Sequence, residues 1–431
     1  MIPSAARAGR PSCAALVVAP MLLATLMVSP LSAKPAPPEA ARGASPLAQT
    51  LCRSLSDAVD AAEPGPVFVA SYRPGPGETE VLAPLRTSAF TYDNALAAIA
   101  LTACGEVDRA RRIGDALLAA LARDRTFSDG RVRNAYRAGP VGAGPLALPG
   151  WWDAKQKLWA EDAYQDGTAT GNVAWAALAL LNLDAAAPQG GYRAGARRML
   201  AWIDGQASDQ REPQGYSGGV DGFDPSQTRL TWKSTEHNLD VHAVAAWLHR
   251  LDGKPDVARI AATARGFLDA VYAPDPGVFR LGTNPAGQLQ PTTHIALDTQ
   301  LWPLIGVVDA PESWRRALDF AERNLATRGG FDFNEDRDGL WVEGTAQAAL
   351  TLRALGRGAD AERLLTTVGR QVSPSGFLFA TDVERLTTGI AIGPASVEPD
   401  FYYFRRPHLG ATAWGVLAAR GWNPFTGRSV E

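Results

Sequence analysis

The sequence of 431 residues has little net charge, only three cysteines and no common cofactor-binding motif. Its 42 Lys and Arg residues and 45 Asp and Glu residues leave a net charge of −3, which does not favour nucleic acid or an anionic membrane surface as a partner. It contains no phosphate-binding glycine loop, zinc-ligand spacing, nucleotide fingerprint or nucleophile-elbow serine. We therefore expect no cofactor, and nothing in the composition indicates an oligomeric state.

The longest apolar run lies near the N-terminus, at 14–28. Two arginines precede it, and small residues at 30–33 follow it. This order of charged, apolar and small residues is typical of a secretory signal peptide, and the run is short for a transmembrane helix. We predict a signal peptide at 1–33, a periplasmic or secreted protein, and no membrane attachment beyond this segment. An uncleaved anchor is the alternative.

Two kinds of helical segment alternate after a linker at 34–46 that is rich in Pro, Ala and Gly. Amphipathic segments with a charged face, typical of surface helices, are expected at 49–62, 106–123, 191–207, 255–272, 311–327 and 358–371. Alanine-rich segments that are apolar nearly all round, typical of buried helices, are expected at 92–103, 171–183, 236–250, 297–307, 343–355 and 409–420. The alternation predicts an all-α domain over 47–425, with six inner helices surrounded by six outer ones.

The connections between these segments also alternate. A short link joins each inner segment to the next outer one, whereas a long loop joins each outer segment to the next inner one. Because short links make antiparallel neighbours, all the long loops should lie at the end where the inner helices begin. Loops longer than about 15 residues are usually functional, so we expect the functional site at that end.

Two cysteines remain after the predicted signal peptide. Cys52 lies at the start of the first outer segment and Cys104 at the end of the first inner one. These two ends meet in an antiparallel helical hairpin, and export permits a disulfide. We predict a Cys52–Cys104 disulfide, with two buried thiols as the alternative.

Acidic residues occupy the starts of four inner segments: Asp93, Glu236, Asp298 and Glu343. Helix capping and the helix dipole explain any one of them. Four carboxylates around one central hole would raise one another's pKa values by repulsion and burial, which is typical of a functional site. These four residues are the predicted catalytic groups.

Aromatic and polar residues gather at the same end of the predicted domain. Flat rings beside carboxylates suit pyranose rings, which stack through their C–H faces and hydrogen-bond through their hydroxyls. Core packing is the alternative for about half of the tryptophans. We expect a poly- or oligosaccharide partner, bound by Tyr92, Trp152, Trp159, Asp162, Trp175, Trp232, His237, Asp240, Gln300, Trp302, Trp341, Tyr402 and His408.

Twelve alternating helices with acidic inner starts resemble the six-hairpin (α/α)6 toroid glycosidases and their relatives. The resemblance covers residues 47–425 and is architectural, since the segments 234–238 (STEHN) and 341–345 (WVEGT) point to no particular specificity. It implies a carbohydrate-active enzyme, most simply an inverting glycoside hydrolase. Such an enzyme needs two carboxyl groups across the scissile bond. We expect Glu236 to be the acid, because nearby Trp232 favours a raised pKa, and Glu343, Asp298 or Asp93 to be its partner.

Other activities occur on related folds, because a fold does not determine a reaction. A terpenoid cyclase fits poorly, because the acids are spread over several helices. A non-catalytic glycan-binding protein would keep the aromatic residues without needing Glu236. An epimerase would use two histidines as a proton pair. A polysaccharide lyase would need a base and a group that neutralises a uronate, for which the candidates are Tyr92, His237, His294, His408, Arg405 and Arg406.

An acidic loop before Glu343 has oxygen ligands at every second residue: Asp332, Asn334, Asp336 and Asp338. This spacing resembles a calcium-binding loop. The match is imperfect, because Arg337 stands where the twelve-residue loop needs glycine. We therefore expect no metal as the first interpretation, with Ca²⁺ as the alternative and an acidic turn as the simplest structural explanation.

Overall fold

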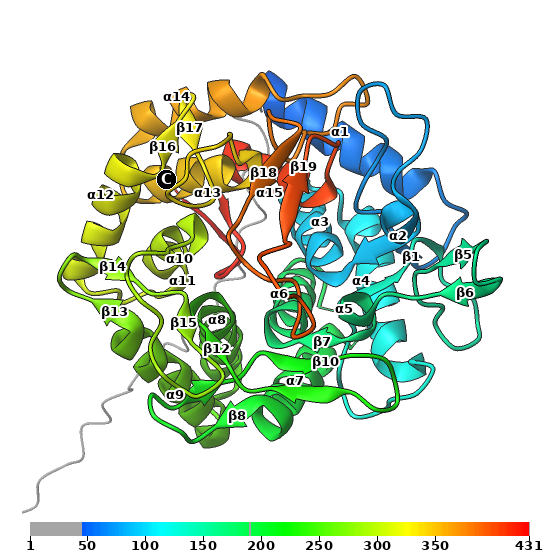
Figure 1. Cartoon of the computed structure of the whole chain (residues 1–431), viewed down its shortest axis with the longest axis horizontal. Helices are drawn as coiled ribbons and strands as arrows, with labels where there is room; N and C mark the ends of the chain where they lie inside the picture. The colour runs from blue at the N-terminus through cyan, green and yellow to red at the C-terminus, as the bar shows by residue number, and fades with distance from the viewer. Residues whose placement is uncertain (1–44, 189–190, 431) are drawn as a thin grey trace, which may run out of the picture. The chain divides into compact units, whose positions relative to one another are not determined.

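The structure is a computed structural model that describes residues 45–188 and 191–430 (Figure 1). The predicted signal peptide at 1–33, and all but the last two residues of the predicted linker, lie outside the described residues. The described domain extends past the predicted end at 425, because strand pairing continues to Ser429. Within this part of the chain, no helix is long and apolar enough to cross a membrane.

Helices dominate the described chain, and each of the twelve predicted segments is helical. The outer helices are α1 Pro46–Asp60, α4 Val107–Arg123, α7 Tyr192–Trp202 with the π-helical turn Ile203–Ala207, α9 Pro255–Val271, α12 Arg315–Asn324 and α14 Gly358–Gly369. The inner helices are α3 Thr91–Cys104, α6 Thr170–Ala186, α8 Thr235–Asp252, α10 Leu297–Leu301 with α11 Pro303–Gly306, α13 Val342–Ala354 and α15 Leu409–Arg420. The fourth inner helix is interrupted before Pro303, because proline has no N–H to donate and clashes with the preceding turn.

The inner helices contact one another in a closed circuit. Each packs against the next one along the chain, and α15 packs against α3 (Figure 1). Backbone hydrogen bonds follow the same circuit, since the first amide of each inner helix donates to the loop that precedes the next inner helix. The donor and acceptor residues are Thr91 and Asn134, Thr170 and Gly218, Thr235 and Leu281, Leu297 and Phe333, Val342 and Ala380, and Leu409 and Ser71. The last of these bonds returns to the loop before α3 and so closes the circuit.

The fourth residue of five inner helices fastens the helix to the loop before it. Its side chain bonds the backbone of one loop residue, in the pairs Asn94–Val69, Asn238–Tyr216, Gln300–Phe279, Thr345–Phe331 and Thr412–Leu378. The prediction that Gln300 binds substrate is therefore not supported. Its buried amide accepts from the N–H of Phe279 and donates to the carbonyl of Phe279, both at 2.9 Å.

Short antiparallel strands and two short helices decorate the loops. The short helices are α2 Ala83–Arg86 and α5 Ala163–Asp166, with a 3-10 turn at Glu312–Trp314. The strands are β1 Val67–Phe68, β2 Ser88–Phe90, β3 Ala135–Arg137, β4 Gly139–Pro140, β5 Trp151–Asp153, β6 Leu158–Ala160, β7 Thr168–Ala169, β8 Ser208–Asp209, β9 Gly215–Tyr216, β10 Gly219–Asp221, β11 Thr228–Leu230, β12 Lys233–Ser234, β13 Tyr272–Ala273, β14 Val278–Phe279, β15 Gly282–Thr283, β16 Ala326–Thr327, β17 Gly330–Phe331, β18 Arg385–Thr387, β19 Tyr402–Phe404, β20 Trp422–Asn423 and β21 Arg428–Ser429. The largest sheet described has three strands, in the order β11-β10-β7.

The C-terminal hairpin β20–β21 packs against the far ends of the inner helices. The Phe425 ring lies 5.1 Å from the ring of Trp175 and 5.6 Å from that of Trp302. Asn423 donates to the carbonyl of Ile305, and Asn182 donates to the carbonyl of Pro424. This hairpin therefore covers the end opposite the long loops.

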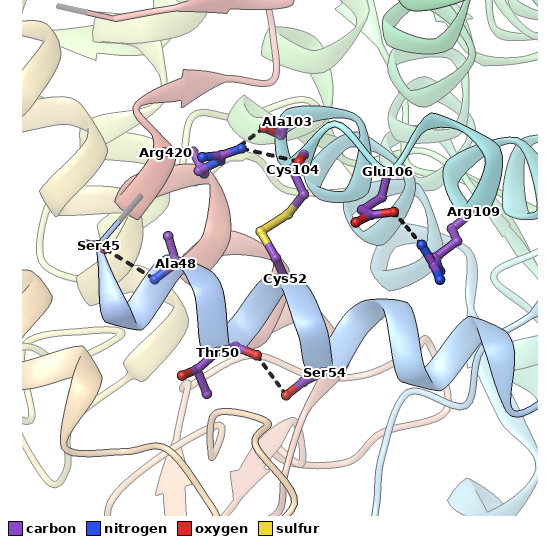
Figure 2. Close-up of a disulfide and its surroundings, with 10 residues drawn as sticks. All are labelled: Ser45, Ala48, Thr50, Cys52, Ser54, Ala103, Cys104, Glu106, Arg109 and Arg420. Carbon is purple, nitrogen blue, oxygen red and sulfur yellow. Dashed lines mark hydrogen bonds and ion pairs between the residues drawn. A yellow bond between two sulfur atoms is a disulfide. The ribbon is translucent and has the colours of Figure 1, made fainter. Parts of the chain in front are cut away.

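A disulfide joins the first outer helix to the end of the first inner helix, as the sequence analysis expects (Figure 2). Cys52 on α1 and Cys104 at the end of α3 have Cα atoms 6.0 Å apart. Arg420, at the end of α15, donates to the carbonyls of Ala103 and Cys104. The end of α3 is therefore tied both to α1 and to the last inner helix.

Candidate active site

Two layers of side chains converge where the inner helices begin. The second residues of these helices form the upper layer: Tyr92, Gly171, Glu236, Asp298, Glu343 and Gly410. The sixth residues form the lower layer: Leu96, Trp175, Asp240, Trp302, Gln347 and Trp414. Residues four apart lie on one face of a helix, so one face of each inner helix serves both layers. Contacts between non-adjacent helices show that these faces meet, since the rings of Trp175, Trp302 and Trp414 pack on one another.

Glu236 and Asp298 form a hydrogen-bonded carboxyl pair. Burial, the charge of Asp298 and the hydrogen bond to Asp298 raise the pKa of Glu236 well above its usual range. Burial raises the pKa of Asp298 to about 6, although the Thr299 N–H at 2.6 Å and Glu236 both favour its ionised form. The hydrogen bond between them raises the pKa of Glu236 and lowers that of Asp298. Glu236 therefore holds the proton and donates the hydrogen bond to Asp298.

Glu236 is also the most accessible member of this pair. Its side chain is 36% exposed, whereas Asp298 is buried. The ring of His237 lies beside Glu236, with its Nε2 atom 3.5 Å from Glu236 Oε1. This ring is neutral, because burial lowers the pKa of His237 to about 4. A protonated carboxyl group that remains accessible is suited to deliver a proton to a bound molecule.

Glu343 lies on α13, which packs beside α10, the helix that carries Asp298. Its Oε1 accepts a hydrogen bond of 2.7 Å from the Tyr92 hydroxyl, which in turn accepts one from the indole of Trp414. Burial raises the pKa of Glu343 to about 7, against the opposing effect of His408. The charge of Glu343 raises the pKa of Glu236, and the described residues show no hydrogen bond between the two. The two carboxyl groups therefore interact without touching.

Asp93 and His408 form a second buried pair beside Glu343. His408 Nε2 lies 3.2 Å from Asp93 Oδ2, and His408 Nδ1 accepts from the N–H of Ala411 at 3.3 Å. Burial lowers the pKa of His408, but the charges of Asp93 and Glu343 outweigh it and raise the pKa overall. Both ring nitrogens are thus engaged, and His408 is almost fully buried.

Gly410 makes room for these groups. A Cβ atom on Gly410 would lie 2.6 Å from Asp93 Oδ1 and 3.1 Å from Glu343 Oε2. Both contacts are shorter than ordinary van der Waals separations, so even alanine would push the carboxylates apart. Glu343 Oε2 is buried and has no hydrogen-bond partner among the described residues.

The lower layer consists of three tryptophans, two polar residues and Leu96. Asp240 lies one turn below Glu236, and burial together with the charges of Glu236 and Asp298 raises its pKa well above the usual range. Gln347 lies one turn below Glu343 and donates to it at 3.5 Å. In the same layer, the rings of Trp302 and Trp414 stack with their centres 5.8 Å apart. This layer forms an aromatic floor below the carboxyl groups.

The loops supply three tyrosines that are not among the predicted binding residues. The ring of Tyr403, on β19, lies 6.4 Å from the ring of His408, and burial and the charges of Glu343, Asp298 and Asp93 raise the pKa of Tyr403. Tyr72 stacks on His408 at 4.6 Å. Burial, the nearby Glu236 and Asp93 raise the pKa of Tyr164 to about 12. No periodic pattern marks such loop residues, because their position depends on how each loop folds back.

The prediction for Tyr402 is corrected by the strand geometry. Successive residues of a strand point to opposite faces. Tyr403 points toward the carboxyl groups, whereas Tyr402 donates to the carbonyl of Pro399 and carries the Arg385 guanidinium 4.7 Å above its ring. The neighbouring tyrosine therefore occupies the position that the sequence analysis assigned to Tyr402.

Most of the remaining predicted residues lie near the carboxyl groups, and the others have different surroundings. Those near the carboxyl groups are Asp93, Glu236, Asp298, Glu343, Tyr92, Trp175, His237, Asp240, Trp302 and His408. Trp232 packs on the ring of His237. Asp162 caps α5, and buried Trp341 packs on Phe333 and Tyr403. Trp152 and Trp159 face solvent on the β5–β6 hairpin, outside the circuit of inner helices (Figure 1), so they do not lie beside the carboxyl groups.

The acidic loop brings three of its four predicted ligands together. Carboxylate oxygens of Asp332, Asp336 and Asp338 all lie within 4.8 Å of one another, a spacing that a cation could bridge. Asn334 instead accepts from the N–H of Asp336. Asp336 and Asp338 also accept hydrogen bonds from Thr387 on β18. The loop thereby holds strand β18 of the hairpin that carries Tyr403.

No protein-family model matches this sequence, and no curated protein matches it. Solved structures match it clearly. A sugar epimerase from a ruminal bacterium has a TM-score of 0.59 at 14% identity, over 87% of this chain and 99% of that one. A glycosidase has a TM-score of 0.55 at 16% identity, over 86% and 96%. Cellobiose 2-epimerase from Bacillus thermoamylovorans B4167 has a TM-score of 0.58 at 10% identity, over 85% and 98%. The resemblance to the six-hairpin toroid glycosidases and their relatives is confirmed at the level of fold.

Proposed function

We propose that this chain is an (α/α)6 toroid glycoside hydrolase that cleaves a poly- or oligosaccharide at the upper layer of its inner helices. One observation carries the proposal: Glu236 holds a proton on a partly exposed side chain, and the charge of a second carboxyl group, Glu343, acts on it without a hydrogen bond between the two. An inverting hydrolase uses an acid and a base about 6.5–9.5 Å apart, so that water fits between the base and the sugar. The glycosidases and sugar epimerases of similar fold support a saccharide as the substrate.

The proposed reaction uses Glu236 as acid and Glu343 as base. Glu236 donates its proton to the glycosidic oxygen while the bond from that oxygen to the anomeric carbon breaks. Glu343 accepts a proton from a water molecule whose oxygen forms the new bond on the opposite face of the sugar. One glycosidic bond and one water are consumed, and the proton gained by Glu343 returns to Glu236 through solvent. The configuration at the anomeric carbon is inverted.

Asp298 is excluded as the base by its contact with Glu236. Two carboxyl groups that share a hydrogen bond are too close to hold a sugar and a water between them. Asp298 instead acts as a positioning residue that keeps the proton on Glu236. Asp93 holds His408, so Glu343 is the remaining carboxyl group of the upper layer.

The alternatives are less well supported by the side chains. An epimerase needs two histidines that can exchange protons, but both nitrogens of His408 are engaged. A lyase needs a cation for a uronate, but the guanidinium of Arg406, next to His408 in the chain, is bound to Glu78. Carboxyl groups and His408 are the charged groups with the largest effects on the pKa values of Glu236 and Glu343.

We also propose that the protein is exported to the periplasm or secreted. The N-terminal sequence pattern supports this, and so does the Cys52–Cys104 disulfide, since disulfides persist mainly in oxidising compartments.

The test is a reducing-end assay of the protein on a panel of neutral and acidic polysaccharides, run beside Glu236→Gln and Glu343→Gln. We expect both variants to fold and to lose activity by a factor of at least about 100, a typical effect of removing acid–base catalysis. NMR of the first products should show the inverted anomer. Activity that persists in Glu236→Gln, or an unsaturated product that absorbs ultraviolet light, would contradict the proposal.

A further inference from the structure

The β5–β6 hairpin exposes two tryptophans that the active site does not use. Trp152 is 60% exposed and Trp159 is 46% exposed. They are directly opposed across the two strands, and opposed residues project from the same face of a ribbon. Among the described residues, neither indole packs on another aromatic ring. Large apolar side chains exposed together usually mark an interaction site.

Neighbouring residues hold the Trp159 ring in place. The Arg137 guanidinium lies 4.9 Å from the centre of the Trp159 ring, a cation–π contact that orients the indole. A Cβ atom on Gly150 would lie 2.4 Å from Trp159 Nε1, so only glycine lets the ring lie this close to the backbone. Thr87 exchanges hydrogen bonds with the backbone of Gly150 at 3.1 and 3.2 Å. Ordered side chains lose less conformational entropy when they bind a partner.

The tip of the hairpin is polar, which favours a saccharide over a membrane as the partner. Asp153 accepts from the N–H groups of Lys155 and Gln156 and from the Gln156 side chain. Lys155 and Lys157 stand beyond the tryptophans at the tip and are exposed. Insertion into a membrane would drive these charges into the lipid before the indoles could follow. A sugar chain, in contrast, stacks on flat rings and accepts hydrogen bonds from such side chains.

We propose that Trp152 and Trp159 form a second saccharide-binding site, on the outer side of the domain, which holds a polysaccharide chain away from the catalytic carboxyl groups. The choice of ligand rests on the proposed function. The hairpin lies beyond α2 and α4, outside the inner circuit (Figure 1). A site there raises the local concentration of long substrates at the active site by binding a second segment of the same chain.

Affinity electrophoresis in native gels that contain hydroxyethyl cellulose, xylan, dextran or xanthan tests the proposal. We expect at least one polymer to retard the wild-type protein and Glu236→Gln. The double variant Trp152→Ala/Trp159→Ala should bind that polymer at least about tenfold more weakly, because two stacking platforms are lost. Val308→Ala, which alters an exposed apolar side chain elsewhere, is the matched control. The double variant should hydrolyse short oligosaccharides at the wild-type rate.

The outcomes separate this site from the catalytic proposal. Retardation lost in the double variant supports the site, even if no hydrolysis is found. Equal retardation of the double variant and the wild type, or no retardation by any of the four polymers, overturns it. Flotation with anionic phospholipid vesicles that is lost only in the double variant, without an effect on retardation, also overturns it in favour of a membrane.

Discussion

Glu343→Gln should stabilise the protein at high pH while abolishing its activity. Burial raises the pKa of Glu343 from 4.5 to about 7. At about 1.4 kcal/mol per pH unit, ionising this carboxyl group costs the folded state about 3 kcal/mol. The carboxyl group therefore contributes most to stability below pH 4.5, and that contribution is lost as the pH rises to about 7. Glutamine stays neutral at every pH and can still accept the hydrogen bond from Tyr92.

The assay is urea unfolding of the wild type and Glu343→Gln at about pH 4 and about pH 8. We expect the stability of the variant, relative to the wild type, to be up to about 3 kcal/mol more favourable at the higher pH. Glu362→Gln, which changes an exposed carboxylate, serves as the control and should show little such difference. If Glu343→Gln gains no relative stability between the two pH values, burial does not raise the pKa of Glu343 and the argument for this residue as base fails.

Three further predictions follow from the same geometry. The kcat/KM should rise as the pH passes about 7, where Glu343 becomes ionised, and should fall once Glu236, whose pKa lies well above its usual range, loses its proton; a maximum near pH 5 would contradict these roles. Gly410→Ala should lower kcat at least about tenfold while the far-ultraviolet circular dichroism stays unchanged, because its Cβ would displace Glu343; full activity would refute this crowding. The double variant Cys52→Ser/Cys104→Ser should lower the free energy of unfolding by up to about 4 kcal/mol, as expected for a bridge between residues 52 positions apart; an unchanged urea midpoint would refute this contribution.

Much of the fold could be predicted because it depends on local periodicity. Helices that are apolar all round must be buried, and amphipathic helices must lie at the surface, so the pattern of inner and outer segments follows from composition alone. The lengths of the loops then determine at which end the inner helices begin. The fourth inner helix departs from the prediction of one continuous segment because Pro303 interrupts it.

The acidic residues could be predicted because they occupy the same position in successive repeats. Glu236, Asp298 and Glu343 are each the second residue of an inner helix, and helices in a closed circuit turn this position toward one centre. The sequence analysis also predicts that Gln300, two residues after Asp298, binds the substrate. Its side chain points to the loop instead, because two residues along a helix correspond to a rotation of more than half a turn.

The sequence by itself determined the helical class, the order of inner and outer helices, the end that carries the candidate site and the identity of the acidic residues there. The tertiary structure decided which carboxyl group holds a proton, which histidine is locked, and which loop residues reach the site. Glu236 bonds Asp298, and His408 bonds Asp93, through contacts between different helices. Tyr403 reaches the site and Trp152 does not, because loop paths depend on hydrogen bonds between segments far apart in the chain, which no local pattern records.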